Sequence, residues 1–244
     1  MKNLILTIFT TFLLLNTTFS QTIAPYKLFI DGTQATLTTY DNLNQVKSIS
    51  NFRYANVIKS GLNLSVNSNT NITDGNGSTL LNKDYGIKLN VNTTTQTQSL
   101  FYDMKYFMPL NVAIQFKNYS VIATGNAYEI PSQISIGQIL PNIRINYNFI
   151  PNLSGLSSAT TTVSYMNRTV QKREKVTTTA GTFTCWKITE DAEIKTNIIT
   201  KQKISRWING DIGFVKIEIR DTNGNLLETE ELTRFRLPSI SNTK

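Results

Sequence analysis

Short runs of β-branched and aromatic residues, separated by Asn, Gly, Asp and Pro, recur along the chain after residue 20. In the run 214–220, the apolar residues Val215, Ile217 and Ile219 alternate with the charged residues Lys216, Glu218 and Arg220. A period of two residues is typical of a half-buried strand, with one apolar face and one face in water. Helical periodicity is nearly absent, so the pattern predicts an all-β protein.

The C-terminal half gives the clearest pattern. Consecutive strands are predicted at 163–178, 182–194, 197–207, 214–220 and 226–235. Gly181 and Gly213 lie at two of the breaks, and we expect at least one of them to have positive φ. Asn223 and Gly224 together are typical of a type I′ turn. Strands joined by such short turns form a meander, which predicts an antiparallel sheet.

The N-terminal half is less regular. Two strands flanking Gly32 are expected to form a hairpin, and four further strands follow. The expected strands are 26–31, 35–40, 46–58, 85–92, 99–106 and 112–123. An α+β fold with one short helix around 99–108 is the alternative.

The first twenty residues have the three parts of a signal peptide. Lys2 supplies a positive charge, residues 4–15 are mostly apolar, and Thr18 and Ser20 are small residues before a cleavage site at Gln21. The apolar run is too short to span a bilayer of about 30 Å. We therefore expect 1–20 to be a signal peptide and 21–244 to form a single β-rich domain in the periplasm or outside the cell. No later stretch is apolar enough to be a transmembrane segment, and no cysteine near Ser20 could take a lipid anchor.

The 244-residue chain has no histidine and one cysteine, Cys185. This composition excludes Ser-His-Asp and Cys-His catalysis, zinc sites built from His or Cys, and an intramolecular disulfide. A lone cysteine is most often a small buried hydrophobe, which is what we expect of Cys185. The formal charge is +8, but the basic residues are scattered, so no nucleic-acid partner is expected. No catalytic residue, metal ligand or cofactor is predicted.

Acidic residues gather in several places. Two segments, 74–78 and 221–225, resemble calcium loops but lack the Gly and Glu that an EF-hand needs, so they are interpreted as hairpin turns. Two carboxylate groups lie on predicted strands beside basic residues, and we expect them to form cross-strand ion pairs on a solvated face. A glycosidase-like acid pair is the alternative. These carboxylates are Glu190, Asp191 and Glu193, and Glu228, Glu230 and Glu231.

A series of short motifs runs in order through most of the chain. Its main members are 103–109, 128–131, 136–141, 176–188, 213–216 and 221–224. In their order and spacing these motifs resemble those of the TapB-like domain proteins, a bacterial secreted family first defined as a domain of unknown function. The resemblance implies one β-sheet domain outside the cytoplasm and brings no activity. It also implies a likeness to periplasmic lipoprotein carriers, whose curved antiparallel sheet surrounds an apolar cavity.

We therefore expect a single, strongly curved antiparallel sheet that can close toward a barrel. Its interior would leave an apolar pocket of roughly 300–1,000 Å³. The favoured function is a non-enzymatic binding module for a lipophilic or envelope-derived ligand, with Trp186 and Trp207 as candidate ligand-binding residues. The alternative is a structural or protein-interaction component of the cell envelope with a solidly packed β core. An enzyme that uses only carboxylates is a third hypothesis.

Overall fold

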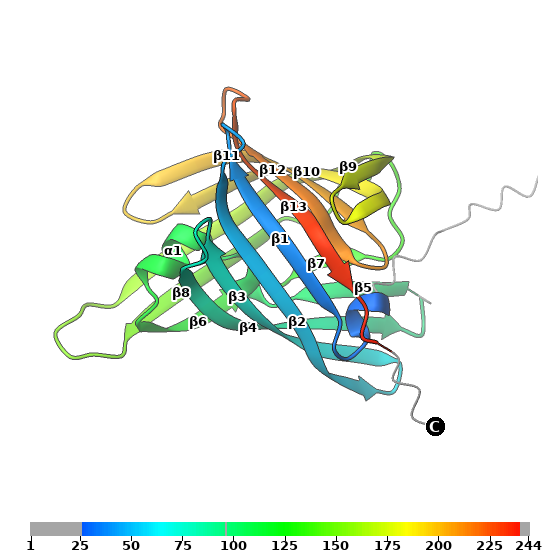
Figure 1. The fold of residues 1–244 in the computed structure, drawn as a ribbon, viewed down its shortest axis with the longest axis horizontal. Coiled ribbons are helices and arrows are strands. Elements are labelled where there is room, and N and C mark those ends of the chain that lie inside the picture. Colours follow the sequence, from blue (N-terminus) through cyan, green and yellow to red (C-terminus); the bar gives the residue numbers. More distant parts are fainter. Residues whose placement is uncertain (1–25, 96, 240–244) are drawn as a thin grey trace, which may run out of the picture.

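The computed structural model describes residues 26–95 and 97–239. Thirteen strands form one antiparallel sheet (Figure 1), which confirms the predicted all-β class. The order across the sheet is β6-β8-β9-β10-β11-β12-β13-β1-β2-β3-β4-β5-β7. The strands are β1 (Gln34–Asp41), β2 (Val46–Ser60), β3 (Asn63–Asp74), β4 (Thr79–Asn92), β5 (Thr97–Tyr102), β6 (Tyr119–Gly125), β7 (Tyr128–Pro131), β8 (Ile143–Pro151), β9 (Ala159–Thr178), β10 (Gly181–Lys195), β11 (Ile199–Asn209), β12 (Gly213–Arg220) and β13 (Leu226–Arg236).

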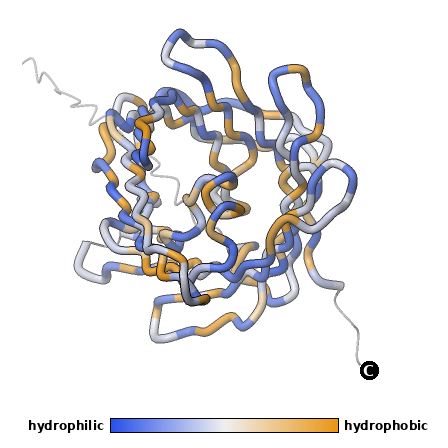
Figure 2. The backbone as a smooth tube through the Cα atoms, turned by 90° about the vertical axis from the view of Figure 1, so that its left-hand side faces the viewer, coloured by the Kyte–Doolittle hydropathy of each residue, from blue (hydrophilic) through white to orange (hydrophobic). Residues whose placement is uncertain are grey.

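The sheet curls until its backbone forms a ring (Figure 2), but hydrogen bonds between strands do not close it. Its two edges, β6 and β7, are consecutive along the chain and are separated only by Asn126 and Ala127. Gly125 ends β6 with φ +128°, and the Asn126 amide donates to the Arg144 carbonyl over 3.0 Å. The chain itself therefore crosses from one edge of the sheet to the other.

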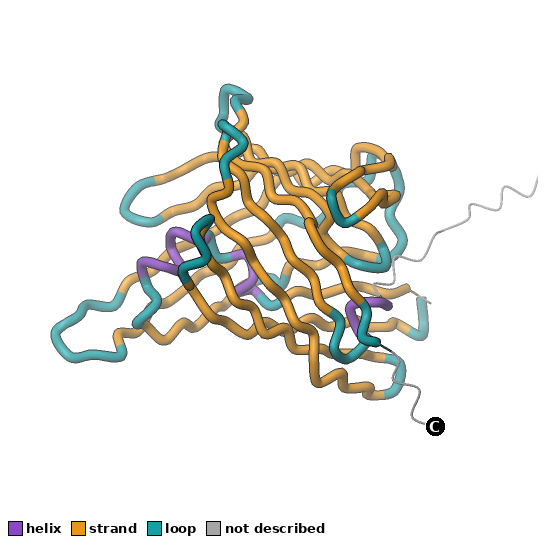
Figure 3. The backbone as a smooth tube through the Cα atoms, in the orientation of Figure 1, coloured by secondary structure: helices purple, strands orange, loops and turns teal. Residues whose placement is uncertain are grey.

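Helical segments fill the space inside the ring. The 3-10 helix η2 (Met104–Phe107) and the helix α1 (Leu110–Gln115) enter from one end, and the 3-10 helix η1 (Tyr26–Phe29) lies toward the opposite end (Figure 3). Phe107 contacts aromatic rings of β5, β7, β9 and β12. Because those strands are spread around the ring, η2 must lie at its centre.

Two of the predicted strands are wrong. Residues 26–31 contain η1 instead of the first arm of a hairpin, since Leu28 and Phe29 are consecutive and both buried. Residues 112–123 are divided between α1 and β6. Val112 and Ala113 are both buried, and Phe116 stacks on Phe149, so one face of a helical turn packs inward. The short helix considered around 99–108 is present as η2.

The end of the β9–β10 hairpin folds back over the outer face of the sheet. β9 contacts β12 and β13, neither of which is its neighbour in the sheet. Thr179 Oγ1, between the two strands, donates to the Thr233 carbonyl over 3.2 Å. This covered region forms a small second layer of packing outside the ring.

Both calcium-like segments are turns, as predicted. Asp74 Oδ1 accepts the amides of Asn76 and Ser78, and Asp221 Oδ1 accepts the amide of Asn225. The 221–225 turn differs from the predicted type I′ geometry, because Gly224 has positive φ (+91°) and Asn223 does not. Gly181 and Gly213 have φ of +135° and +80°, which confirms that prediction for both.

No helix among the described residues is long and apolar enough to cross a membrane. The predicted signal peptide, residues 1–20, lies outside the described residues.

Candidate functional site

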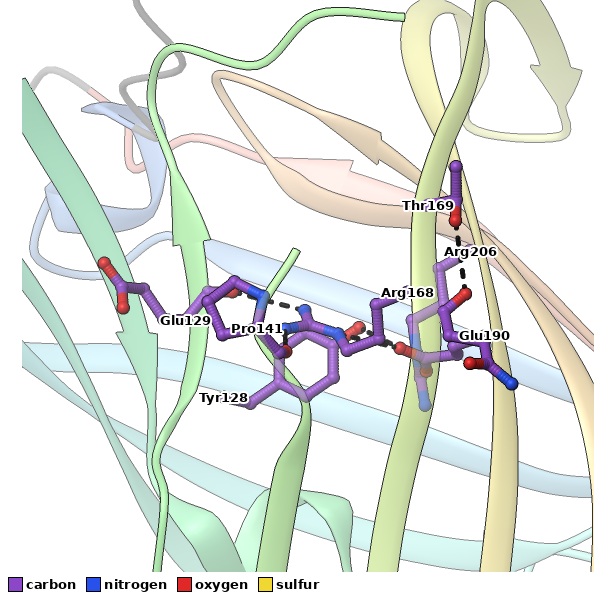
Figure 4. Close-up of polar contacts among 8 residues, drawn as sticks. Tyr128, Glu129, Pro141, Arg168, Thr169, Glu190 and Arg206 are labelled. Atoms are coloured by element: carbon purple, nitrogen blue, oxygen red, sulfur yellow. Dashed lines mark hydrogen bonds and ion pairs between the residues drawn. The ribbon is translucent and has the colours of Figure 1, made fainter. Parts of the chain in front are cut away.

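Four side chains form a buried polar cluster in the interior of the curled sheet. Tyr128 comes from β7, Arg168 from β9, Glu190 from β10 and Arg206 from β11 (Figure 4). The side chains of Arg168 and Glu190 are 1% and 0% exposed, and that of Arg206 is 6% exposed. We call these four residues the charge cluster.

Glu190 is the centre of the charge cluster. Its Oε1 accepts from Arg206 Nε over 2.6 Å, and its Oε2 accepts from Arg168 Nε over 3.2 Å and from the Tyr128 hydroxyl over 3.0 Å. Burial, with the Glu190 charge beside it, raises the pKa of Tyr128 to about 12. The phenol is therefore protonated at neutral pH and can donate its hydrogen to the carboxylate.

Arg168 extends beyond Glu190 to β7, one edge of the sheet. We call the region between β7 and β9, which are not paired in the sheet, the seam. Its Nη1 donates to the Pro141 carbonyl over 2.8 Å and its Nη2 to the Glu129 carbonyl over 3.3 Å. Its guanidinium carbon also lies 4.4 Å from the centre of the Tyr128 ring. The planar fork of an arginine suits this task, because several N–H groups can bond at once.

Arg206 is surrounded by aromatic rings. Its guanidinium carbon lies between 5.3 and 5.6 Å from the ring centres of Phe107, Tyr128, Tyr165 and Phe214. Burial would lower the pKa of Arg206, but the adjacent Glu190 carboxylate outweighs it and the pKa is raised. The guanidinium therefore remains a cation, held by one carboxylate and by ring faces.

The chemistry of the charge cluster is that of a permanent ion triad. Two guanidinium groups share one carboxylate, and an arginine does not give up its proton in proteins. The cluster joins four strands around the interior and supports the seam between β7 and β9. This arrangement is suited to fixing the fold.

Little space is left inside the ring. The interior pocket lined by Phe52, Tyr54, Tyr102, Tyr106 and Phe214, with four aliphatic neighbours, has a volume of about 10 Å³. That volume corresponds to about one water molecule. This pocket is far smaller than the expected apolar pocket of several hundred Å³, because the Tyr106 ring from η2 packs against Tyr102, Phe107 and Phe214 there.

The two tryptophans do not line that interior pocket. Trp207 is buried beneath the folded-back β9–β10 hairpin, where its Nε1 donates to Glu174 Oε1 over 2.7 Å. Lys187 Nζ lies 4.5 Å from the centre of the Trp207 ring. Trp186 is half-buried, with the Arg173 guanidinium carbon 5.7 Å from its ring. Ligand binding by either residue remains a prediction.

Cys185 is fully buried, as predicted. Burial, with the Glu174 charge nearby, raises the pKa of its thiol to about 12. The thiol lies 3.6 Å from the Phe183 carbonyl. Such a thiol is a packing group and a poor nucleophile at neutral pH.

The expected cross-strand ion pairs are found for three of the six carboxylates. Glu193 pairs with Lys201, Glu228 with Lys47 and Glu231 with Lys216. Asp191 accepts a hydrogen bond from Asn167. Glu190 instead lies in the charge cluster. Glu230 shares its strand face with Leu232, which is buried, so it points inward as well.

A second, open pocket lies on the outer face of β4, β5 and β7. Its volume is about 440 Å³ and its lining is largely polar. The residues are Asn63, Asn90, Val91, Asn92, Thr97, Ser99, Phe101 and Glu129. It is a shallow depression and none of the predicted site residues lies in it.

Among the described residues, no group of three Asp, Glu or Cys side chains is placed to hold a metal ion.

Comparison with known proteins identifies structures of similar fold and the family of this chain. A protein of YmcC-like fold from Bacteroides fragilis, described as exported, superposes with a TM-score of 0.71 at 19% identity, covering 88% of this chain and 99% of that one. A protein from Parabacteroides distasonis, described as a lipoprotein, gives 0.70 at 15% identity with the same coverage. No curated protein matches the sequence. The DUF3108-like family model matches residues 30–232, so the chain belongs to the DUF3108-like family.

Proposed function

We propose that this chain is a non-enzymatic component of the bacterial cell envelope, located outside the cytoplasm. In this role the curled sheet is a packed scaffold that makes contacts through its outer surface. The observation behind the proposal is the filled interior, in which Tyr106 and Phe107 occupy the space that a lipophilic ligand would need. We also propose that, within the DUF3108-like family, this chain is one of the TapB-like secreted proteins.

The location is supported by the similar structures and by the sequence. Two proteins of similar structure, those from Bacteroides fragilis and Parabacteroides distasonis, are described as exported and as a lipoprotein. The tripartite N-terminus predicts export of this chain too. The non-enzymatic role is supported by the lack of histidine and by the burial of Cys185, which leave little nucleophilic or general-base chemistry.

A titration with a fluorescent fatty-acid analogue, after delipidation, tests the packed interior. The wild-type protein is expected to show no saturable binding. Phe107→Ala removes the ring at the centre of the interior and should create an apolar cavity that takes up a small probe such as benzene. Saturable binding of the analogue to the wild type, competed by envelope lipids, would contradict the proposal and favour a carrier.

Chemical crosslinking in the native host tests the scaffold role. Discrete crosslinked species that contain this protein and a second envelope protein are expected. Recovery of the protein from the cytoplasmic fraction, or of the free monomer alone after crosslinking, would count against it.

A further inference from the structure

One end of the molecule carries three arginines without acidic partners. Arg53 of β2 and Arg236 of β13 are both in register with Gln34 of β1, so they lie in one row across three strands. Two strand spacings separate them by about 10 Å. Arg234 lies two residues along β13, on the same face and about 7 Å from Arg236. All three arginines are exposed.

The surroundings of these arginines do not neutralise them. Within the described ranges 26–95 and 97–239, none of the three forms an ion pair. Their register neighbours on β1, Gln34 and Thr36, are uncharged, as is Asn69, the neighbour of Arg53 on β3. Two carboxylates lie in this region, and neither forms an ion pair with the three arginines: Asp31 accepts from the Asn56 amide and Asp84 from the Asn69 side chain, each over 2.9 Å. Three guanidinium charges against two carboxylates leave the region with a positive balance.

Exposed aliphatic side chains lie at the same end. The chain before β1 meets β2 here, since the Gly32 amide donates to the Tyr54 carbonyl over 2.8 Å. The chain after β13 passes beside Gly32 through Pro238. Four large aliphatic residues are between 40% and 61% exposed in this region, namely Ile30, Ile58, Leu62 and Leu237. In Figure 1 the β2–β3 turn, η1 and the end of β13 are together at the lower right.

We infer that this end, which we call the basic end (Arg53, Arg234, Arg236 and these four aliphatic residues), docks on an anionic phospholipid surface. Arginines pair with lipid phosphates, and the aliphatic side chains enter the interface between headgroups and acyl chains. The inference rests on the proposed location in the envelope. It names one envelope component that the scaffold contacts.

The opposite end lacks this combination. The β10–β11 turn exposes Ile198 and Ile199, but its lysines alternate with acids: Lys201 pairs with Glu193, and Lys203 is in register with Asp191. Its local charge is therefore mixed. An anionic surface should be met by the basic end and not by this turn.

Vesicle co-sedimentation of the mature protein tests the inference. Vesicles of phosphatidylcholine alone are compared with vesicles that also contain phosphatidylglycerol, at low and at high salt. We expect binding to the anionic vesicles, release by salt, and weak binding to the neutral ones. The triple variant Arg53→Gln/Arg234→Gln/Arg236→Gln should lower the partition coefficient roughly a hundredfold.

A matched control removes the same number of charges at the opposite end. Lys195→Gln/Lys201→Gln/Lys203→Gln changes exposed residues and should leave vesicle binding within a few-fold of the wild type. Equal loss in the two triple variants would show a net-charge effect and would overturn the inference, as would equal binding to neutral and anionic vesicles. Arginine-dependent binding to soluble poly-aspartate, without vesicle binding, would assign the basic end to an acidic protein instead.

Leu62→Ser in the wild-type background tests the aliphatic part. It should lower vesicle binding several-fold while keeping the dependence on phosphatidylglycerol. Failure of all vesicle binding would overturn the docking inference. It would leave the packed scaffold untouched, because the fatty-acid titration and the crosslinking experiment judge that proposal separately.

Discussion

Arg168 on β9 donates a hydrogen bond from Nη2 to the main-chain carbonyl of Glu129 on β7, 3.3 Å away. These strands are not neighbours in the sheet, since β7 pairs only with β5 and β9 lies between β8 and β10. The same guanidinium donates to the Pro141 carbonyl, and a single bridge joins Ile139 to Thr169 nearby. A buried side chain thus supplies contacts across the seam that the strand ladder does not make.

Arg168→Lys should therefore destabilise the protein although it keeps the charge. A lysine ammonium is a point donor and cannot bond Glu190 and both carbonyls in the same geometry. Loss of charged hydrogen bonds in a buried site predicts a decrease of about 1.5–3 kcal/mol in the free energy of unfolding. Urea denaturation measures it. The control is Arg144→Lys, because Arg144 is an exposed residue of β8. This substitution should change the free energy of unfolding by less than about 0.5 kcal/mol.

Glu190→Gln should be more damaging still, because it leaves two buried guanidinium groups without a counter-charge. Removing one partner of a buried ion pair costs about 3–5 kcal/mol. The comparison variant is Glu193→Gln, whose partially exposed pair with Lys201 is worth at most about 1 kcal/mol. Equal stability losses in the two variants would contradict the central role of Glu190.

The C-terminal meander could be predicted because each strand alternates in polarity and ends at a recognisable turn. The predicted strands 163–178, 182–194, 197–207, 214–220 and 226–235 correspond to β9–β13 with small differences at their ends. In β12 the inward residues Ile217 and Ile219 are apolar and their neighbours are charged. Local pattern and tertiary burial agree there, so sequence reasoning succeeds.

The hydrophobic pattern does not predict β3, and the reason is chemical. Its outward positions are mostly asparagine, a residue that is depleted in strands, and its inward positions include Ser68 and Thr70. The asparagines form a ladder with β4, in which Asn71 Nδ2 donates to Asn82 Oδ1 over 2.7 Å. Hydrogen bonds between side-chain amides on β3 and β4 stabilise this strand. A search for alternating hydrophobic residues does not detect such bonds.

The sequence indicates part of the charge cluster through the positions of its charged residues along the strands. This indication is easily overlooked, because Glu190 also belongs to a group of neighbouring acids. Glu190 is in phase with Ile188 and Ala192, both of which are buried. Arg206 is likewise in phase with the buried residues Ile204 and Ile208. Charged residues at inward positions of two adjacent strands indicate a buried pair. Tyr128 on β7 also belongs to the cluster, but β7 is far from β10 and β11 in the strand order. Only the curvature of the sheet brings it to Glu190, and the sequence pattern does not report that curvature.

Cys185 is expected to react slowly with a thiol reagent in the native state and fast after unfolding. The thiol is 0% exposed, and burial raises its pKa to about 12, so thiolate is scarce at pH 8. Absorbance on reaction with a disulfide reagent measures the rates. Thr182→Cys in a Cys185→Ser background places an exposed thiol on the same strand and should react fast in buffer. Equal native rates for the two proteins would show that Cys185 is accessible.

Gly125→Ala should cost more stability than a glycine substitution in an open turn. A Cβ at Gly125 would lie 2.1 Å from the Arg144 carbonyl oxygen, at φ +128°. The backbone would have to shift at the crossing between the two sheet edges, so we expect a loss above about 3 kcal/mol. Gly77→Ala has φ +87° and no atom within 4 Å of the new Cβ, so it should cost about 1–2 kcal/mol. Similar melting temperatures for the two variants would argue against a tight crossing.

The stability of the protein should fall as pH rises through weakly acidic values because of Glu230. Burial raises the pKa of this carboxyl to about 7; Arg206 opposes the shift and Glu228 adds to it. In the unfolded chain the pKa is close to 4.5, so between pH 4.5 and about 7 the folded state binds more protons than the unfolded state. Stability therefore decreases with rising pH over this window, by on the order of 1–3 kcal/mol. Below pH 4.5 this contribution is fully present.

Glu230→Gln isolates that contribution. Glutamine resembles the protonated carboxyl, so the variant should match the wild type near pH 4.5 and exceed its stability at pH 8. Glu231→Gln is the control: its carboxylate pairs with Lys216 over 3.5 Å, and the substitution should leave the pH profile unchanged between 4.5 and 7. Denaturant midpoints measured across this range give the profile. A wild-type profile parallel to that of Glu230→Gln would mean that burial does not raise the pKa of the Glu230 carboxyl.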